Sequence, residues 1–212
     1  MNKYKIKKFI SFIIIGSMSF NIMSCNVVRK DVKSNLKSIE SPTNNLDVKT
    51  ISQSDLMDIN SKNITTLKEF LSAYEIPFLS SNDGTKETEI CLDYESIRDN
   101  NLNMSHLNGL NYLVGDDNKF RCEFNISLDS DKEVQIKDTL LKEFYESFIG
   151  DSLPDSIINS WKDIIKDTKA KRKDTITLVD FYKDYMKISL KLTLDNIVTL
   201  EIIIPDEVEI TD

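Results

Sequence analysis

The sequence predicts an α+β domain in which helices pack on one face of an antiparallel sheet. Apolar and polar residues alternate through 120–128 and 185–194, which is the pattern of half-buried strands. Apolar residues recur at helical spacing in 140–148 and 157–165. Hairpin-like strand pairs flank these helices instead of alternating with them. No glycine-rich phosphate loop is present, so a nucleotide-binding parallel sheet is not expected.

The first 25 residues have the layout of an export signal. Four lysines (Lys3, Lys5, Lys7 and Lys8) precede an apolar core, Phe9 to Ile15, and Gly16, Ser17 and Ser19 then break the apolar run. A basic start, a short apolar core and small residues before a cleavage site describe a secretory signal. A membrane-spanning helix needs about 20 mostly apolar residues, so this shorter segment is the weaker candidate for a permanent anchor.

The end of this segment carries a more specific motif. Ile22, Met23, Ser24 and Cys25 resemble the lipobox of bacterial lipoproteins, in which an aliphatic residue, a tolerant position and a small residue precede cysteine. The resemblance implies signal cleavage between Ser24 and Cys25 and attachment of lipid to Cys25. Two acyl chains are sufficient for stable anchoring. We therefore expect a lipid-anchored protein on the extracytoplasmic face of a bacterial cell membrane.

The charge of the chain limits its partners. The whole sequence has 27 basic and 35 acidic residues, and residues 1–24 hold four of the lysines, which leaves 23 − 35 = −12 for the remainder. Such a charge disfavours nucleic acid, whose binding depends on basic side chains. It also disfavours flat binding to anionic lipid, so membrane contact is assigned to the lipid anchor. We expect no cofactor and no metal.

Composition divides the chain into three parts. Residues 1–24 form the signal, residues 25–60 form the lipidated cysteine and a polar tether, and residues 61–212 form a single α+β domain. The tether is rich in Asn, Ser, Lys and Asp with isolated apolar residues, although 54–59 could form a short helical turn.

The sequence of the first half of the domain predicts one helix and three strands. The helix begins near Thr66, which has capping-box spacing to Glu69, and ends before Pro77. A strand is expected at 87–94. Residues 112–114 and 119–128 flank a turn and predict a hairpin. Residues 95–110 are not assigned.

The second half predicts two helices and a meander of strands. One helix follows the capping-box pair Ser130 and Glu133 and ends at Gly150, and the next starts near Pro154 and buries Trp161. Strands follow at 175–182, 185–194 and 197–204, with a two-residue turn at Asp195 and Asn196. This arrangement resembles cystatin-like or NTF2-like small domains in architecture alone, which implies little about function.

Two cysteines remain in the domain, and export permits a disulfide between them. Cys91 lies between the apolar residues of its strand and therefore points to the opposite face. Cys122 is itself one of the residues on the apolar face of its strand. In one sheet the two sulfurs would lie on opposite faces, so we do not expect a bridge.

The candidate sites are weak. The only histidine, His106, could pair with Cys91 or Cys122 as base and nucleophile, but no family signature surrounds them, and no G-x-S-x-G elbow occurs.

The acids Asp129, Asp131 and Glu133 alternate like calcium ligands without the glycine of an EF-hand loop, so a solvated helix cap is favoured. The cations Lys169, Lys171, Arg172 and Lys173 complement a helix C-terminus, or else contact anionic envelope polymer or lipid headgroups.

The sequence therefore predicts a membrane-anchored lipoprotein with a small non-catalytic domain that binds an envelope protein or a small ligand. Two alternatives stay open. One is an envelope hydrolase that uses His106 or scattered acids, and the other is an accessory subunit of a membrane complex.

Overall fold

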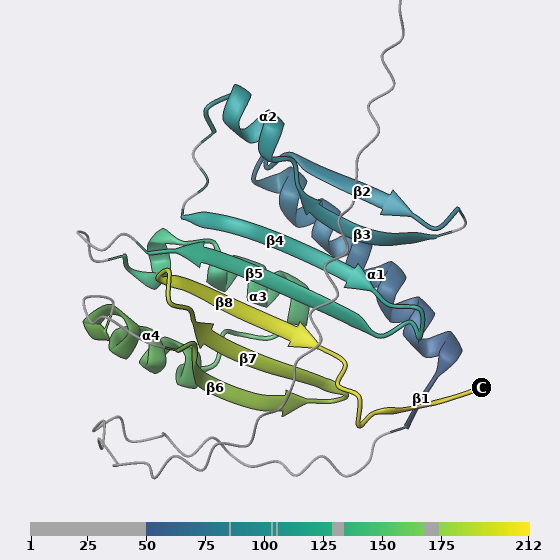
Figure 1. The fold of residues 1–212 in the computed structure, drawn as a ribbon. Helices are drawn as coiled ribbons and strands as arrows, with labels where there is room; N and C mark the ends of the chain where they lie inside the picture. Colours follow the sequence, from purple (N-terminus) through teal and green to yellow (C-terminus); the bar gives the residue numbers. More distant parts are fainter. Residues whose placement is uncertain (1–49, 85, 103, 105, 129–133, 168–173) are drawn as a thin grey trace, which may run out of the picture. The chain divides into compact units, whose positions relative to one another are not determined.

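The structure is a computed structural model that describes residues 50–212 except 85, 103, 105, 129–133 and 168–173. The predicted signal, the lipobox with Ser24 and Cys25, and most of the predicted tether lie outside the described residues. So do the acidic group at 129–133 and the basic group at 169–173. Within the described part, the predicted fold class is confirmed: helices accompany a seven-stranded antiparallel sheet (Figure 1).

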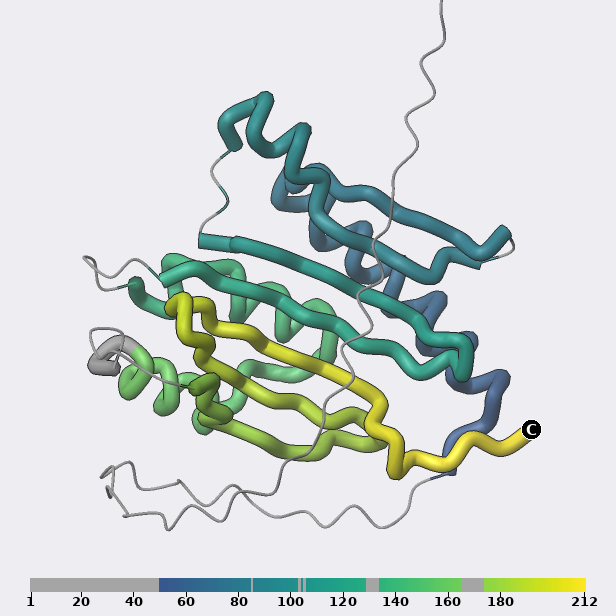
Figure 2. Tube along the Cα trace, viewed as in Figure 1, coloured from purple at the N-terminus to yellow at the C-terminus, as the bar shows by residue number. Residues whose placement is uncertain are grey.

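The main sheet contains the strands β2 (Phe78–Asn82), β3 (Glu87–Leu92), β4 (Leu107–Val114), β5 (Phe120–Ser127), β6 (Ile176–Lys183), β7 (Met186–Leu192) and β8 (Ile197–Ile203). Their spatial order is β2-β3-β4-β5-β8-β7-β6, and every neighbouring pair is antiparallel. Two short strands, β1 (Thr50–Ser52) and β9 (Glu209–Thr211), form a separate parallel pair. This pair brings the C-terminal residues beside the first described ones (Figure 2).

The first helix, α1 (Gln53–Ala73), begins well before the predicted start at Thr66. The Ser52 hydroxyl caps it by accepting a hydrogen bond from the N–H of Asp55 at 3.1 Å. Residues 53–60, which the sequence assigned to the tether, are therefore helical and part of the domain.

A buried polar residue explains this difference. Asn60 occupies a core-facing position of α1 between the buried residues Leu56 and Ile64, so the apolar stripe is interrupted. The Asn60 amide donates to the backbone carbonyl of Asn118 and accepts from the Tyr112 hydroxyl, both at 2.8 Å. These partners satisfy the amide, which is why a polar side chain is stable there.

The next segment contains two elements that the sequence did not predict. β2 is an exposed strand at the edge of the sheet, and α2 (Tyr94–Asp99) is a short helix capped by Asp93. β4 begins at Leu107, earlier than predicted, and passes through a register shift between Leu107 and Gly109. The predicted hairpin to β5 is confirmed, and Asn118 in its turn has φ 61°.

Two helices connect the halves of the sheet. A 3₁₀ turn, η1 (Ile136–Asp138), precedes α3 (Leu141–Ile149), so this helix starts later than the capping-box spacing predicted. Gly150 ends α3 in the left-handed conformation, as predicted, with φ 80°. In α4 (Asp155–Asp167), Trp161 is buried as predicted and donates its indole N–H to the Val134 carbonyl at 3.0 Å.

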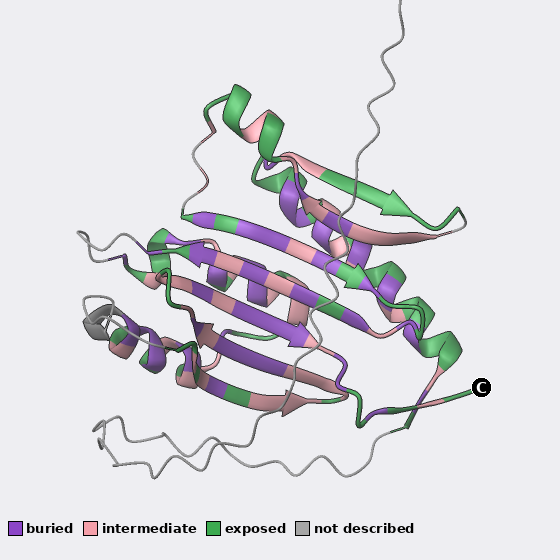
Figure 3. Cartoon of the chain, viewed as in Figure 1, coloured by how far each residue is buried: buried purple, intermediate pink, exposed green. Residues whose placement is uncertain are grey.

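The predicted meander of β6, β7 and β8 is confirmed, with Asn196 in its turn at φ 57°. Alternate side chains of β5, β7 and β8 are buried on the helix-covered face of the sheet (Figure 3). One face of the sheet packs against α1, α3 and α4 in a single core. Aromatic rings fill its centre, where Phe124 and Phe144 stack with centroids 4.4 Å apart. The opposite face of the sheet is called the open face below.

Candidate functional site

The open face carries a network of polar side chains across four neighbouring strands. In the register of β5, β8, β7 and β6, one row is Glu123, Glu201, Ser189 and Asp180. These side chains point away from the helices because side chains alternate along a strand. Within the described part of the chain, no helix covers this face. The polar side chains of the network therefore lie directly between the sheet and solvent.

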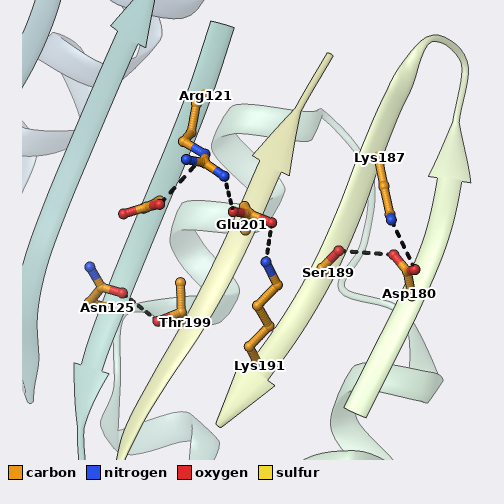
Figure 4. Close-up of polar contacts among 9 residues, drawn as sticks. Arg121, Asn125, Asp180, Lys187, Ser189, Lys191, Thr199 and Glu201 are labelled. Carbon is orange, nitrogen blue, oxygen red and sulfur yellow. Dashed lines mark hydrogen bonds and ion pairs between the residues drawn. The ribbon is translucent and has the colours of Figure 1, made fainter. Parts of the chain in front are cut away.

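Glu201 is the centre of the network (Figure 4). Its carboxylate accepts from Nη2 of Arg121 in β5 at 2.9 Å, and its other oxygen pairs with Nζ of Lys191 in β7. The Glu201 side chain is only 7% exposed, whereas that of Arg121 is 56% exposed. The cations therefore shield the acid and present their own charge to solvent. Arg121 also lies 3.7 Å from the Glu123 carboxylate.

A second set of contacts lies beside the first. The Asp180 carboxylate in β6 accepts from the Ser189 hydroxyl at 2.9 Å and pairs with Lys187 at 3.2 Å (Figure 4). Burial alone would lower the pKa of Lys187, but the hydrogen bond and charge of Asp180 raise it above its ordinary value. The Thr199 hydroxyl donates to Oδ1 of Asn125 at 2.6 Å. These contacts hold the side chains in fixed positions on the open face.

Toward β4 and β2, the open face also carries exposed leucines among its polar side chains. Leu113 in β4 is 46% exposed and Leu79 in β2 is 53% exposed. The Tyr94 hydroxyl donates to the Asn108 carbonyl at 3.1 Å, and a Cβ added at Gly109 would lie 3.2 Å from the Tyr94 oxygen. The absence of a side chain at Gly109 therefore lets Tyr94 lie across β4 while remaining 57% exposed.

Two hollows border these elements. One of 510 Å³ lies at the end of the open face, with Leu113, Arg121, Lys187 and Ile203 among its lining residues. Its Lys119 donates to the backbone carbonyls of Pro205 and Asp206, so that ammonium already has partners. The other hollow, of 420 Å³, lies beside α1 and is lined by residues that include Asn60, Lys86 and Asn118. Neither hollow is lined by His106, Cys91 or Cys122.

The residues considered for nucleophilic chemistry are far apart. His106 is exposed in a turn with φ 68°, and its carbonyl accepts from the N–H of Ser127 at 2.9 Å. Cys122 lies five residues from Ser127 along β5, which is roughly 16 Å at the rise of a strand. Cys91 is opposite Asn111, a similar number of residues from His106. The structure does not bring these side chains together.

Both thiols also have raised pKa values. Burial is the main cause at Cys91, with the negative charge of Glu89 adding to it, and burial in the core is the main cause at Cys122. The prediction that the two cysteines lie on opposite faces is confirmed, because Cys122 packs in the helix-covered core and Cys91 faces the open side. Both are free thiols.

Sequence patterning predicted the outward positions of β7 but not the network that they form. Lys187, Ser189 and Lys191 alternate with apolar residues, which predicted that they point outward, although Ser189 is only 3% exposed. Their partners Asp180 and Glu201 come from other strands, so the contacts depend on the register between strands. Glu201, which lies within the apolar run of β8, was the signal in the sequence that could have indicated the network, because a buried charge requires a partner.

No family model, curated protein or solved structure matches this chain. Among the residues that the structure describes, no group of three or more His, Cys, Asp or Glu side chains could hold a metal ion. No described helix is long and apolar enough to span a membrane.

Proposed function

We propose that this chain is a lipid-anchored bacterial envelope lipoprotein whose domain binds a protein partner through the open face of its sheet, without catalysing a reaction. The observation that carries the proposal is the combination on that face of an ordered ion-pair network with exposed Leu113 and Tyr94. Protein interfaces are enriched in aromatic side chains and arginine relative to the rest of the surface.

The anchor is supported by the sequence. Four lysines, a short apolar core and the lipobox-like Ile22, Met23, Ser24 and Cys25 favour cleavage before Cys25 and lipid attachment to it. The net charge of −12 after removal of residues 1–24 disfavours nucleic acid and direct adsorption to anionic lipid. A lipid anchor on Cys25 would leave the domain at the extracytoplasmic face of the cell membrane, where a protein partner can reach it.

A protein is favoured over a small ligand because of how the polar groups are arranged. Small-ligand sites are concave and largely enclosed, with a few convergent polar groups. The open-face side chains are spread over four strands and pair mainly with one another. The envelope hydrolase has less support, because the thiols have raised pKa values and lie far from His106. An accessory subunit of a membrane complex would use the same open face, so its partner would be a membrane protein.

The anchor is tested by the intact mass of the N-terminal peptide from the membrane fraction. We expect a peptide that begins at Cys25 and carries added acyl mass, and we expect Cys25→Ala to lose membrane retention. An unlipidated N-terminus would show a secreted domain, and a retained Met1 would show an uncleaved anchor.

The open face is tested separately by photo-crosslinking in cells. A photoreactive residue is placed at Leu113 or Ser127 on the open face, and at Lys142 or Asn159, which are exposed on α3 and α4, as controls. We expect the same protein adduct from both open-face positions and none from the controls. The purified adduct protein should then bind wild type and Lys142→Glu equally but Leu113→Asp at least tenfold more weakly. Adducts from the helix positions alone, or equal binding by Leu113→Asp, would contradict the proposal.

A further inference from the structure

Among the residues that the structure describes, β2 has no strand partner on one side of its backbone. It is the outermost strand of the sheet, and within this part of the chain it pairs with β3 alone. The N–H of Asp93 donates to the carbonyl of Pro77 at 3.0 Å, which marks that pair as hydrogen-bonded. Because hydrogen-bonded and non-hydrogen-bonded pairs alternate in an antiparallel ladder, Leu79 and Ser81 direct their backbone groups at β3. The N–H and C=O groups of Phe78 and Ser80 therefore face outward.

The two edges of the sheet differ in how they are protected. Natural proteins prevent an edge strand from pairing with another chain by placing charged residues, proline or bulges in it, or by covering it with another element. β6, at the far edge, carries Asp180 and Lys183, has a register shift between Thr177 and Val179, and packs against α4. β2 is the uncharged sequence Phe-Leu-Ser-Ser-Asn, and its irregularity lies at its end, between Ser81 and Asn82. The β2 edge is thus the one where an added strand meets least opposition.

The surroundings of β2 indicate the chemistry of such a strand. Residues 74–95, which include β2, β3 and their flanks, contain six acids and one basic residue, Lys86. The Lys86 ammonium is held by the side chain of Asn118, and Lys68 of α1 pairs with Glu87, so an excess of acids remains. Apolar contacts are available as well, since Leu79 is 53% exposed and Tyr74, just before the strand, is 43% exposed. An acidic edge with apolar flanks fits a basic segment with alternating apolar residues.

We propose that the free edge of β2 binds an extended segment of a partner protein that alternates apolar residues with lysine or arginine. The segment would add an eighth strand and pair with the outward backbone groups of Phe78 and Ser80. A second copy of this chain fits less well, because it would bring two acidic 74–95 segments together. The inference goes beyond the open-face proposal, since it concerns the edge of the sheet, and either can fail alone.

Ser80 offers a matched pair of variants for the test. After the larger contribution of Lys68, the Ser80 hydroxyl also lowers the pKa of the Glu87 carboxyl, and Ser80→Ala and Ser80→Pro both remove that hydroxyl. Only proline removes the outward N–H, and proline is tolerated on edge strands when that N–H faces solvent. The two variants therefore separate the edge backbone from the side chain.

The probe is an acetylated and amidated peptide of about nine residues that alternates valine with lysine, long enough to cover a strand. Binding to the full-length protein in detergent is measured by calorimetry, and protection of residues 78–82 by hydrogen exchange. We expect wild type and Ser80→Ala to bind alike and to gain at least tenfold protection. We expect Ser80→Pro to bind at least tenfold more weakly, and we expect a peptide with glutamate in place of lysine not to bind.

Several results would overturn the inference. These are no binding of the valine–lysine peptide to wild type, unchanged binding by Ser80→Pro, or equal binding of the glutamate peptide. A wild-type dimer that Ser80→Pro dissociates would assign the edge to a second copy instead. Should Ser80→Pro fail to fold, as judged by circular dichroism, the same peptide with every backbone amide methylated replaces the variant. That peptide should lose binding to wild type, and retained binding would contradict strand addition.

Discussion

The carboxylate of Glu201 lies 2.9 Å from the guanidinium of Arg121 on a sheet face that no described helix covers. The acid is almost fully buried, whereas the cation above it is half exposed. Lys191 pairs with the second carboxylate oxygen from the other side. The charge of Glu201 is thus desolvated by its own partners, which makes the three side chains an interdependent group.

This geometry predicts an asymmetric response to substitution. Glu201→Gln leaves two cations that can rehydrate, so we expect a loss of about 1 kcal/mol in the free energy of unfolding. Arg121→Gln combined with Lys191→Gln leaves a nearly buried carboxylate without a cation, and we expect a loss of about 3 kcal/mol. Urea denaturation followed by tryptophan fluorescence measures both. Adding Glu201→Gln to the double variant should restore part of its stability, and equal losses in all variants would contradict an interdependent group.

The buried amide of Asn60 predicts a second stability effect. Asn60→Leu removes a donor to the Asn118 carbonyl and an acceptor for the Tyr112 hydroxyl, both buried. We expect a loss of about 2–3 kcal/mol, because a buried carbonyl loses its donor and a buried hydroxyl loses its acceptor. The matched control is Asn63→Leu one turn along α1, whose amide contact to Tyr112 is long, at 3.5 Å. Thermal unfolding of Asn63→Leu should stay close to wild type, and a similar loss in both would assign the effect to leucine itself.

Asn60 also shows why α1 was only partly predicted. The second half of α1 has a continuous apolar stripe, and its presence there could be inferred from spacing alone. The first half places an amide in the stripe, and the amide is stable only because the β4–β5 hairpin supplies partners from distant sequence. Local periodicity cannot reveal such partners.

The strands also differ in whether their own sequences predict them. β5, β7 and β8 are flanked on both sides in the sheet and bury their apolar side chains on the helix-covered face, so their sequences carry the two-residue period. β2 is exposed along nearly its whole length, so its sequence lacks that period. β1 and β9 form only through pairing between the two ends of the described chain. The network around Glu201 depends on register, which alternation within a single strand does not specify.

Trp161 should stabilise the domain both by packing and by a hydrogen bond, and two substitutions separate these contributions. Its ring is 3% exposed, and its indole N–H donates to the Val134 carbonyl. Trp161→Phe should cost about 1–2 kcal/mol, because a buried carbonyl loses its donor, and Trp161→Ala should cost about 3–5 kcal/mol through the cavity it creates. Denaturation followed by circular dichroism measures both. Ile158→Ala on the same helix, only partly buried, should cost less than Trp161→Ala, and the reverse order would contradict a central role for the indole.

The two domain cysteines predict different alkylation behaviour in a Cys25→Ser background. Cys91 is partly exposed, and burial together with Glu89 raises its pKa, so its thiolate fraction at neutral pH is below that of a free cysteine. We expect slow labelling of Cys91 by iodoacetamide, with a rate that rises about tenfold per pH unit while the pH stays below the pKa. Cys122 is fully buried with a raised pKa, so it should label only when the domain unfolds. Peptide mass spectrometry across pH 7–9, with and without urea, separates the two sites. Native labelling of Cys122 at the rate of Cys91 would contradict its burial, and a labelling rate of Cys91 independent of pH would contradict the raised pKa.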